Sequence, residues 1–154
     1  RRQRQMCIRD SYYSINIRRL PKLDAGELGI VKVTASDEPQ PENNKDNALD
    51  GDFNTRWSAD GNGVWLQLDL GEVKEVEALG VAFYLGDQRF NYYDVQVSED
   101  GENFEDVSTN TSSGTTLDYE YTEVGKKARY IRIVGNGTSE GTWFSVTEVK
   151  VLGE

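Results

Sequence analysis

The stretch DNALDGDFNTRWSADG, residues 46–61, holds the densest group of side chains in this chain that could do chemistry. Asp and Asn recur through it at spacings of one to six residues, and Gly51 lies among them. Such a group could act in three ways: as paired catalytic carboxylates, as oxygen ligands of a cation, or as a turn held by its own hydrogen bonds.

Asp50 and Asp52 are the candidate catalytic pair, because two carboxylates are the machinery of glycoside hydrolysis. A catalytic acid also needs a pKa that burial in an apolar pocket has raised. A loop of glycine and amide residues would instead keep both carboxylates ionised. We therefore expect no catalysis by this loop.

A cation suits the same loop better, since Ca²⁺ takes about six to eight hard oxygen ligands and one loop can supply several of them. The EF-hand template does not fit. After Asp50, Asp52 and Asn54 it requires Gly at the sixth position and Glu at the twelfth, where this chain has Thr55 and Gly61. A calcium site of another kind and a plain Asx-rich turn both remain open.

Composition removes several classes of function. The chain has no histidine and a single cysteine, Cys7, which excludes Ser-His and Cys-His nucleophiles, imidazole metal sites and an internal disulfide. Residues 1–22 carry seven Lys or Arg against Asp10 alone, a charge of +6, while residues 23–154 carry ten against 26 acids, a charge of −16. So acidic a body predicts no nucleic-acid partner and no binding to anionic membranes. No run of 18 apolar residues is present, so no membrane span is expected.

The elements that must position these residues are short strands with period-two alternation. The predicted strands are VWLQLDL (64–70), ALGVAFYL (78–85), YDVQVS (93–98), LDYEYT (117–122), RYIRIVG (129–135) and SVTEVKVL (145–152). In LDYEYT, the alternation places Leu117, Tyr119 and Tyr121 on the buried face. Turn signals separate the strands, and only NNKDNALD looks helical, so the pattern predicts an all-β sandwich or barrel.

The organisation along the chain follows from these patterns. Residues 1–11 have no strand or helix periodicity and are expected to be a non-native or disordered basic arm. Residues 12–30 are interpreted as a linker or the end of a preceding domain, and residues 31–154 as the folded domain. Since the sequence starts at Arg1 rather than Met, we expect it to be part of a longer protein.

Two further stretches are expected to form surface loops. In YLGDQRF, residues 84–90, Tyr84 leaves a strand, and Asp87, Gln88 and Arg89 follow a glycine. Trp143 follows GNGTSEGT, a run of small and polar residues. Sugars bind to aromatic faces and to side chains with several hydrogen-bonding groups, and an arginine fork suits the carboxylate of a uronate. The alternative is a plain surface hairpin in which Asp87 and Arg89 pair with each other.

The series NALDGDFNTRWSA, WLQLDLG, SEDGENFEDV, ARYIRIVGNG and WFSVTEVKV resembles the discoidin or coagulation-factor (F5/8) type C superfamily. Within it the chain is most similar to family 32 carbohydrate-binding modules, and FYLGDQRF and GNGTSEGTWFSVTEV look like the modules of alginate lyases. The resemblance implies an eight-stranded jelly-roll, or galactose-binding-like, β-sandwich whose ligand is held by loops at one end. The lipid-binding members close the domain with a disulfide and carry apolar and basic loop tips, neither of which is evident here.

The resemblance also implies site residues. A single structural Ca²⁺ would be held by Asn47, Asp50, Asp52, Thr55, Thr147 and Glu148. The sugar site would comprise Tyr84, Asp87, Gln88, Arg89, Asn136 and Trp143. The two other tryptophans, Trp57 and Trp65, fall at positions that are core in this superfamily and are assigned to packing.

The function that follows is binding of a polysaccharide or oligosaccharide without catalysis. The domain would target a secreted or cell-surface polysaccharide-degrading enzyme, such as an alginate lyase, whose catalytic domain belongs to the same parent chain. A monomer is expected. An adhesion or lectin-like domain that binds a cell-surface glycan or protein is the main alternative, and a self-standing hydrolase or lyase is a third.

Overall fold

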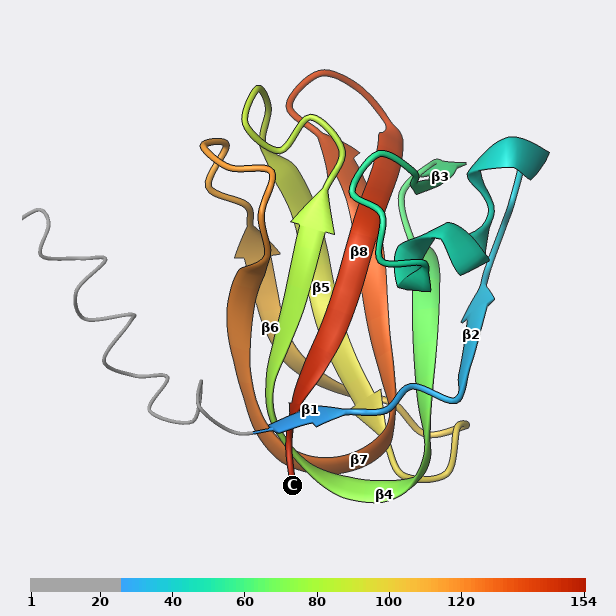
Figure 1. Ribbon diagram of the computed structural model, residues 1–154, viewed down its shortest axis with the longest axis vertical. Coiled ribbons are helices and arrows are strands. Elements are labelled where there is room, and N and C mark those ends of the chain that lie inside the picture. The colour runs from blue at the N-terminus through green and yellow to red at the C-terminus, as the bar shows by residue number, and fades with distance from the viewer. Residues whose placement is uncertain (1–25) are drawn as a thin grey trace, which may run out of the picture.

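The computed structural model describes residues 26–154 as an antiparallel β-sandwich with two short 3-10 helices (Figure 1). The strands are β1 (Gly26–Leu28), β2 (Lys32–Ala35), β3 (Trp57–Asp60), β4 (Val64–Phe83), β5 (Asn91–Ser98), β6 (Glu105–Thr111), β7 (Glu120–Thr138) and β8 (Trp143–Gly153). The helices are η2 (Pro41–Asn43) and η3 (Lys45–Leu49), in the segment where the sequence predicts a helix. None of the helices in this described part has the length and apolarity that a membrane span requires.

Two long bent strands join the layers of the sandwich. Residues 64–69 of β4 pair with residues 130–135 of β7 in one layer, while residues 78–81 of β4 pair with residues 120–123 of β7 in the other. Figure 1 shows β4 and β7 curving at one end of the molecule, where each passes from layer to layer. The hydrogen-bonded order is β1-β8-β4-β7-β5-β6, with β2 on β4 and β3 on β8, and the bends of β4 and β7 fold it into two layers. The predicted eight-stranded all-β sandwich is confirmed.

The core lies between these layers and is built by alternation. Leu66 and Leu68 of β4 face the same side as Ile131 and Ile133 of β7, and all four are fully buried. Trp57 is also fully buried; its ring packs edge-on against Phe144, and its indole N–H donates to the Asp37 carbonyl at 3.0 Å. The assignment of Trp57 to packing is confirmed.

Trp65 lies on the opposite face of β4 from the core. Its neighbours Val64 and Leu66 point inward, so Trp65 points outward and is only half buried. The Arg132 guanidinium lies 4.2 Å from the Trp65 ring and 3.9 Å from the Phe104 ring. Trp65 therefore packs on the outer surface of the sheet, and its expected place in the core is wrong, because the alternation of β4 turns Val64 and Leu66 inward instead.

The tyrosines of LDYEYT face outward, contrary to the sequence prediction. Leu117 is 51% exposed, and Tyr119 and Tyr121 lie beside Lys150, whose amine is 4.4 Å from the Tyr119 ring. Thr122, of opposite parity to Tyr121, lies 3.4 Å from the hydroxyl of the core residue Tyr93. Alternation alone fixes two faces but not which of them meets the second layer, and here the face of Thr122 meets it.

The boundaries differ in detail from those predicted. The structure continues 64–70 and 78–85 as the single strand β4, and adds β2, β3 and β6, which are too short or too polar to show a period-two signal. Gly26–Leu28, within the stretch interpreted as a linker, forms β1 and pairs with residues 151–153 of β8. The remainder of the predicted arm and linker, residues 1–25, lies outside the described residues.

Candidate functional site

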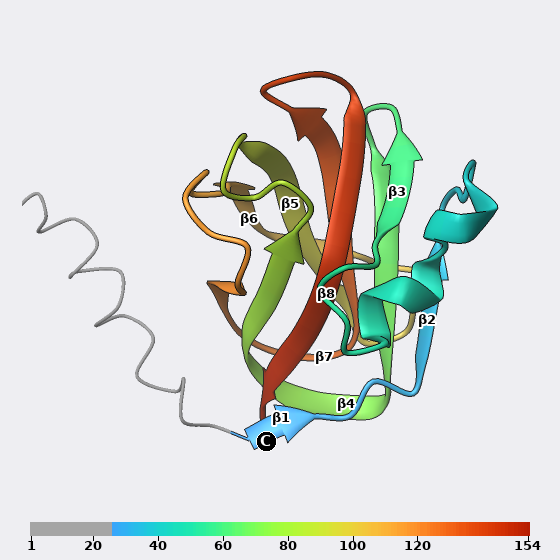
Figure 2. The same ribbon diagram turned by 45° about the horizontal axis from the view of Figure 1, so that its top comes forward.

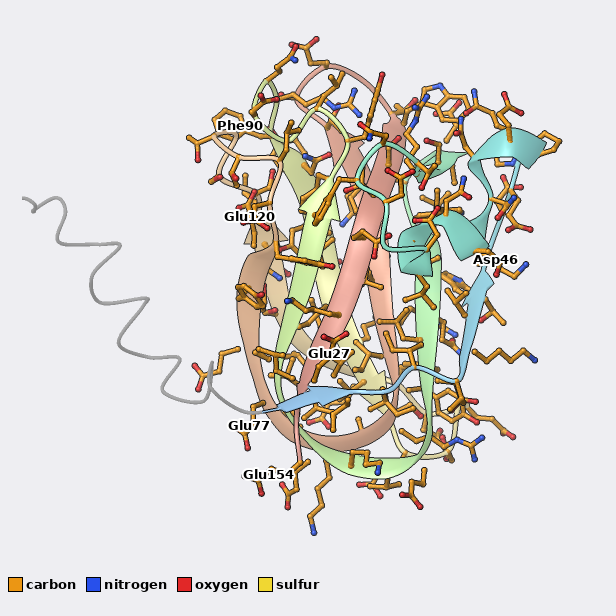
Figure 3. All side chains as sticks on the ribbon, viewed as in Figure 1. Glu27, Asp46, Glu77, Phe90, Glu120 and Glu154 are labelled. Atoms are coloured by element: carbon orange, nitrogen blue, oxygen red, sulfur yellow. The ribbon has the colours of Figure 1, made fainter. Side chains whose placement is uncertain are left out.

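Two loops that are far apart in the sequence meet at one end of the sandwich. One follows β4 at residues 84–90, and the other joins β7 to β8. The Phe90 amide donates to the Ser139 Oγ at 3.0 Å, and the Ser139 amide donates to the Phe90 carbonyl at 2.9 Å, across 49 residues of chain. Figure 3 labels Phe90 at this end, opposite the end where β4 and β7 bend. The two stretches that the sequence singled out as loops are therefore neighbours.

The loop after β4 is held in one shape by its own backbone. Leu85 has a φ of 56°, a left-handed conformation that is uncommon outside glycine. Its carbonyl accepts hydrogen bonds from the Gln88 amide at 2.9 Å and the Arg89 amide at 3.2 Å. Such a turn costs about 1–3 kcal/mol and persists where the surrounding structure fixes it. Asp87 and Gln88 consequently stand exposed at the tip, while Arg89 turns back toward Tyr84.

Arg89 is the most unusual side chain of this loop. Its Nε is buried and has no hydrogen-bond partner within residues 26–154. Its guanidinium carbon lies 5.6 Å from the centre of the Tyr84 ring. Burial lowers the pKa of the Arg89 guanidinium, although arginine stays charged at any ordinary pH. No ion pair joins Asp87 to Arg89 in the described part of the chain, so the plain-hairpin alternative lacks the contact on which it depends.

A second arginine, which the sequence analysis missed, lies on the same ring. Arg56 precedes β3, and its guanidinium carbon is 3.9 Å from the centre of the Tyr84 ring. Its Nε donates to the Ser58 Oγ at 3.1 Å, and Ser58 in turn shares a 2.7 Å hydrogen bond with Ser145. Arg56 stands 28 positions before Tyr84 and in a different element, so no local pattern could join them. The lack of an acidic partner is what marks Arg56 as unusual, and this lack is visible only in the structure.

The remaining predicted sugar residues separate into two places. Trp143 begins β8 opposite Asp60 of β3 and is 37% exposed. The hydroxyl of the preceding residue, Thr142, donates to the Asp60 carboxylate at 2.5 Å. Asn136 lies on β7, and its amide donates to the Asp94 carboxylate of β5 at 3.3 Å. The Asn136 amide group is therefore directed at a neighbouring strand of the sheet.

The predicted metal residues gather around the turn that follows η3. The Thr55 hydroxyl lies 2.5 Å from the Asp50 carboxylate, 3.1 Å from the Asp52 carbonyl and 3.5 Å from the Asn47 carbonyl. The Asn47 side chain donates to the Arg56 carbonyl at 2.9 Å, so the main-chain oxygen of Asn47 is the one that faces the turn. Oxygen atoms of four residues, Asn47, Asp50, Asp52 and Thr55, thus lie close together at this turn.

Glu148 of β8 closes the turn from the other side. Its carboxylate accepts a hydrogen bond from the Gly51 amide at 2.8 Å, and only 3% of the residue is exposed. Burial and the neighbouring Asp50 carboxylate raise the pKa of Glu148 to about 7. The hydroxyl of the adjacent Thr147 is buried without a partner among the described residues, at a point where the β4–β8 register skips a residue. The oxygen atoms of these groups thus lie between the turn and the last strand, β8.

The oxygen atoms around this turn are a mixed set of ligands that suits a hard cation, rather than a cluster of acidic side chains. Within residues 26–154, no group of three or more His, Cys, Asp or Glu side chains is arranged to hold a metal ion. The expected ligands are instead a mixture of two or three carboxylates with hydroxyl and carbonyl oxygens, a composition that suits Ca²⁺. Asp50 has a lowered pKa although burial opposes this, because Thr55 and backbone amides donate to it, so its carboxylate is ionised as the sequence analysis expected.

Comparison with known proteins gives a family and several relatives. The model of the F5/8 type C domain matches residues 32–149. The family 32 carbohydrate-binding module of AlyQ, solved with 4,5-unsaturated mannuronic acid, is 38% identical over 82% of this chain and 98% of that chain, with a TM-score of 0.79. Truncated AlyQ, which contains this module and an alginate lyase domain, is 39% identical over 84% of this chain and 34% of that chain, with a TM-score of 0.80.

A curated relative is the polysaccharide lyase 8 family protein HylA of Enterococcus faecalis. It is 41% identical over 61 residues, which are 39% of this chain and 4% of HylA. The chain thus spans a small part of that relative.

Proposed function

Because the chain belongs to the F5/8 type C domain family and is a family 32 carbohydrate-binding module, we propose that it binds an acidic polysaccharide at its loop end. The bound polymer would be held by the 84–90 loop and the segment leading into β8. Modules of this family bind without cleaving, so the domain is non-catalytic. It would serve as the targeting domain of a larger polysaccharide-degrading enzyme.

The surroundings of Arg89 are the main observation that supports this proposal. A guanidinium with a buried, unpartnered Nε retains hydrogen-bonding capacity that the described residues leave unused. It lies beside the Tyr84 ring and on the same end of the sandwich as the exposed Trp143. An aromatic face packs on the apolar face of a sugar ring, and a guanidinium forms charge-assisted hydrogen bonds to a carboxylate.

Alginate is the ligand class that the relatives support best. The AlyQ module was solved with an unsaturated mannuronic acid, and truncated AlyQ joins that module to an alginate lyase domain. We propose the same association here: a parent chain with a catalytic domain for a uronate polymer, acting outside the cell on its substrate. Neither nucleic acid nor membrane is proposed as a partner, because residues 26–154 carry 25 acids against ten cations.

We further propose that the turn after η3 binds one structural Ca²⁺. Its ligands would be oxygens of Asn47, Asp50, Asp52, Thr55, Thr147 and Glu148. The ion would supply positive charge between the Asp50 and Glu148 carboxylates, whose proximity is otherwise repulsive. It would thereby join the turn to β8. At the contact between these two parts, Gly51 and Glu148 are 97 residues apart in the sequence.

Affinity electrophoresis in gels containing alginate tests the binding site. One monosaccharide of about 12 heavy atoms, at roughly 0.3 kcal/mol per atom, gives a dissociation constant in the millimolar range. Weak binding that several contacts along a polymer strengthen is therefore expected. Arg89→Ala removes a charge-assisted contact of about 1.5–3 kcal/mol, so its affinity should fall roughly 10- to 150-fold. Trp143→Ala should weaken binding as well.

Arg132→Ala is the matched control, because Arg132 lies on the outer face of the sheet against Trp65 and Phe104. It removes the same charge without touching the loop end. Unchanged alginate retardation in both Arg89→Ala and Trp143→Ala would show that the site assignment is wrong. Equal retardation of the wild type in gels with and without alginate would overturn the choice of polymer.

A further inference from the structure

Arg56 and Arg89 share the ring of Tyr84, with their guanidinium carbons 3.9 Å and 5.6 Å from its centre. They come from separate elements: Arg56 from the turn before β3, and Arg89 from the loop after β4. Figure 2 shows β3 beside the first half of β8, near the end of the sandwich that carries the two loops. The fold thus brings two permanent positive charges to the same aromatic ring.

Neither guanidinium has an acidic partner. Within residues 26–154, no carboxylate lies within 4.0 Å of Arg56 or Arg89, and no residue accepts a hydrogen bond from the terminal nitrogens of either one. Lys45, Lys74, Lys126 and Arg129 do have ion pairs. Acids outnumber bases by 25 to ten in this part of the chain, yet both arginines on the Tyr84 ring remain without an ion pair.

The two charges repel each other, and the fold nevertheless holds them together. Arg56 is one of the groups that lower the pKa of Arg89, after burial itself. The Glu140 carboxylate is the acid that acts on Arg89 from the neighbouring loop, but at a longer range than an ion pair. Stacking on Tyr84 offsets part of the repulsion, since a guanidinium is attracted to an aromatic face.

Arg56 is also held in place before any ligand arrives. Its Nε donates to Ser58, which is buried and hydrogen-bonded to Ser145 of β8. Its carbonyl accepts from the Asn47 side chain. A guanidinium fixed at its Nε presents its remaining N–H groups in one direction, so less side-chain entropy is lost when an anion binds.

We propose that Arg56 and Arg89 form a two-arginine clamp that holds a sugar carboxylate beside Tyr84, so that the module selects uronate units over neutral sugars. Each carboxylate oxygen can accept from a different guanidinium, and the anion removes the repulsion between the two. This inference rests on the proposed sugar site at the loop end. Arg56 is accordingly a specificity-determining residue, while the stacking surface at Trp143 serves charged and neutral sugars alike.

Calorimetric titration with two matched ligands tests the clamp. The first is a mannuronate tetrasaccharide; the second is the same oligomer with its carboxylates reduced to alcohols. The wild type should bind the uronate at least about tenfold more tightly than the reduced oligomer. Arg56→Gln should remove most of this preference by weakening uronate binding about tenfold, with the affinity for the reduced oligomer unchanged.

Further variants separate the clamp from a structural role. Arg56→Lys keeps the charge but not the fork, so it should retain part of the preference. In the double variant Arg56→Gln with Arg89→Gln, the loss should be smaller than the sum of the single losses, because one carboxylate is shared. Arg132→Gln is the control for a change of net charge away from the loops and should keep the full preference.

The outcomes distinguish a failure of the two-arginine clamp from a failure of the proposed sugar site. If Arg56→Gln, with unchanged melting temperature, keeps the wild-type preference, the clamp is wrong and the sugar site stands. If it weakens both oligomers equally, Arg56 acts as a positioning residue and the clamp is again wrong. If the wild type binds neither oligomer, the proposed function fails and the clamp with it.

Discussion

Glu120, at the start of β7, is a carboxylate whose surroundings favour its protonated form. One oxygen accepts a hydrogen bond from the Ser113 amide at 2.8 Å, and the other is buried without a partner among the described residues. Burial raises the pKa of Glu120 above its ordinary value, although the Ser113 hydrogen bonds oppose this. The folded state therefore binds the proton more tightly than the unfolded state, and this contribution to stability is lost as the pH rises through the folded-state pKa.

We predict that Glu120→Gln stabilises the fold at neutral pH. Glutamine keeps an acceptor for Ser113 and removes the charge that burial penalises. Well below the unfolded pKa of about 4.3, both proteins are neutral at this position, so their unfolding free energies should converge there. Denaturant titrations from pH 3.5 to pH 8 measure the difference, in which the other titrating groups cancel. A difference that stays constant with pH would show that Glu120 has no raised pKa.

The packing of β7 against its neighbours requires that residue 135 have no side chain. A Cβ at this position would lie 2.3 Å from Cγ and 2.4 Å from Cδ2 of Phe144, which is fully buried in the neighbouring layer. Phe144 also packs edge-on against Trp57 and Phe83, so a shift of its ring would disturb these two contacts. The close approach of β7 to β8 below the loop end therefore requires glycine.

We predict that Gly135→Ala destabilises the domain by about 1–3 kcal/mol, the usual cost of overpacking a core. Each kcal/mol corresponds to a fall of about 2–4 °C in melting temperature for a domain of this size. Gly29→Ala is the control, because nothing lies within 4 Å of a Cβ built there. Thermal unfolding followed by near-UV circular dichroism measures both. Equal melting temperatures for the two variants would show that Phe144 can yield.

At the scale of the whole molecule, the proposed calcium site would act as a link between remote parts of the chain. We predict that EDTA lowers the melting temperature, because a ligand at about 100 times its dissociation constant stabilises the fold by roughly 2.7 kcal/mol. Asp50→Ala should abolish this dependence on calcium. Asp46→Ala removes a charge from the same segment outside the ligand set and should retain it. Identical melting curves for the wild type with calcium and with EDTA would leave the turn as a hydrogen-bonded Asx turn.

The second whole-molecule prediction is that the purified chain releases no product from alginate. The sequence has no histidine, and Asp50, the first acid of the candidate pair, is held ionised by its hydrogen bonds. Reducing ends and the ultraviolet absorbance of unsaturated uronates should stay at the level of a heat-treated sample. Accumulation of either product above that level would contradict a purely binding role.

Local patterns along the chain predict the all-β class and most of the strands, whereas the packing role of Trp57 was expected from the resemblance to a family. Alternation and turn residues act over a few positions, so they can be read from the chain without knowing its partners. The same local signals marked residues 84–90 and the segment before Trp143 as loops with aromatic and polar side chains. Their meeting at one end was implied only by resemblance to a family.

Which residues face each other depends on how the strands pair and pack. The alternation around Tyr119 and Tyr121 is as the sequence predicts, but the packing of the two layers places the opposite face, that of Thr122, toward the core residue Tyr93. Asn136 is directed at Asp94 because β5 pairs with β7 in that register. Arg56 reaches Tyr84 only because β3 pairs with β8 beside the end of β4. Strand pairing over tens of residues depends on the packing of the whole sandwich, and no pattern within one segment carries that information.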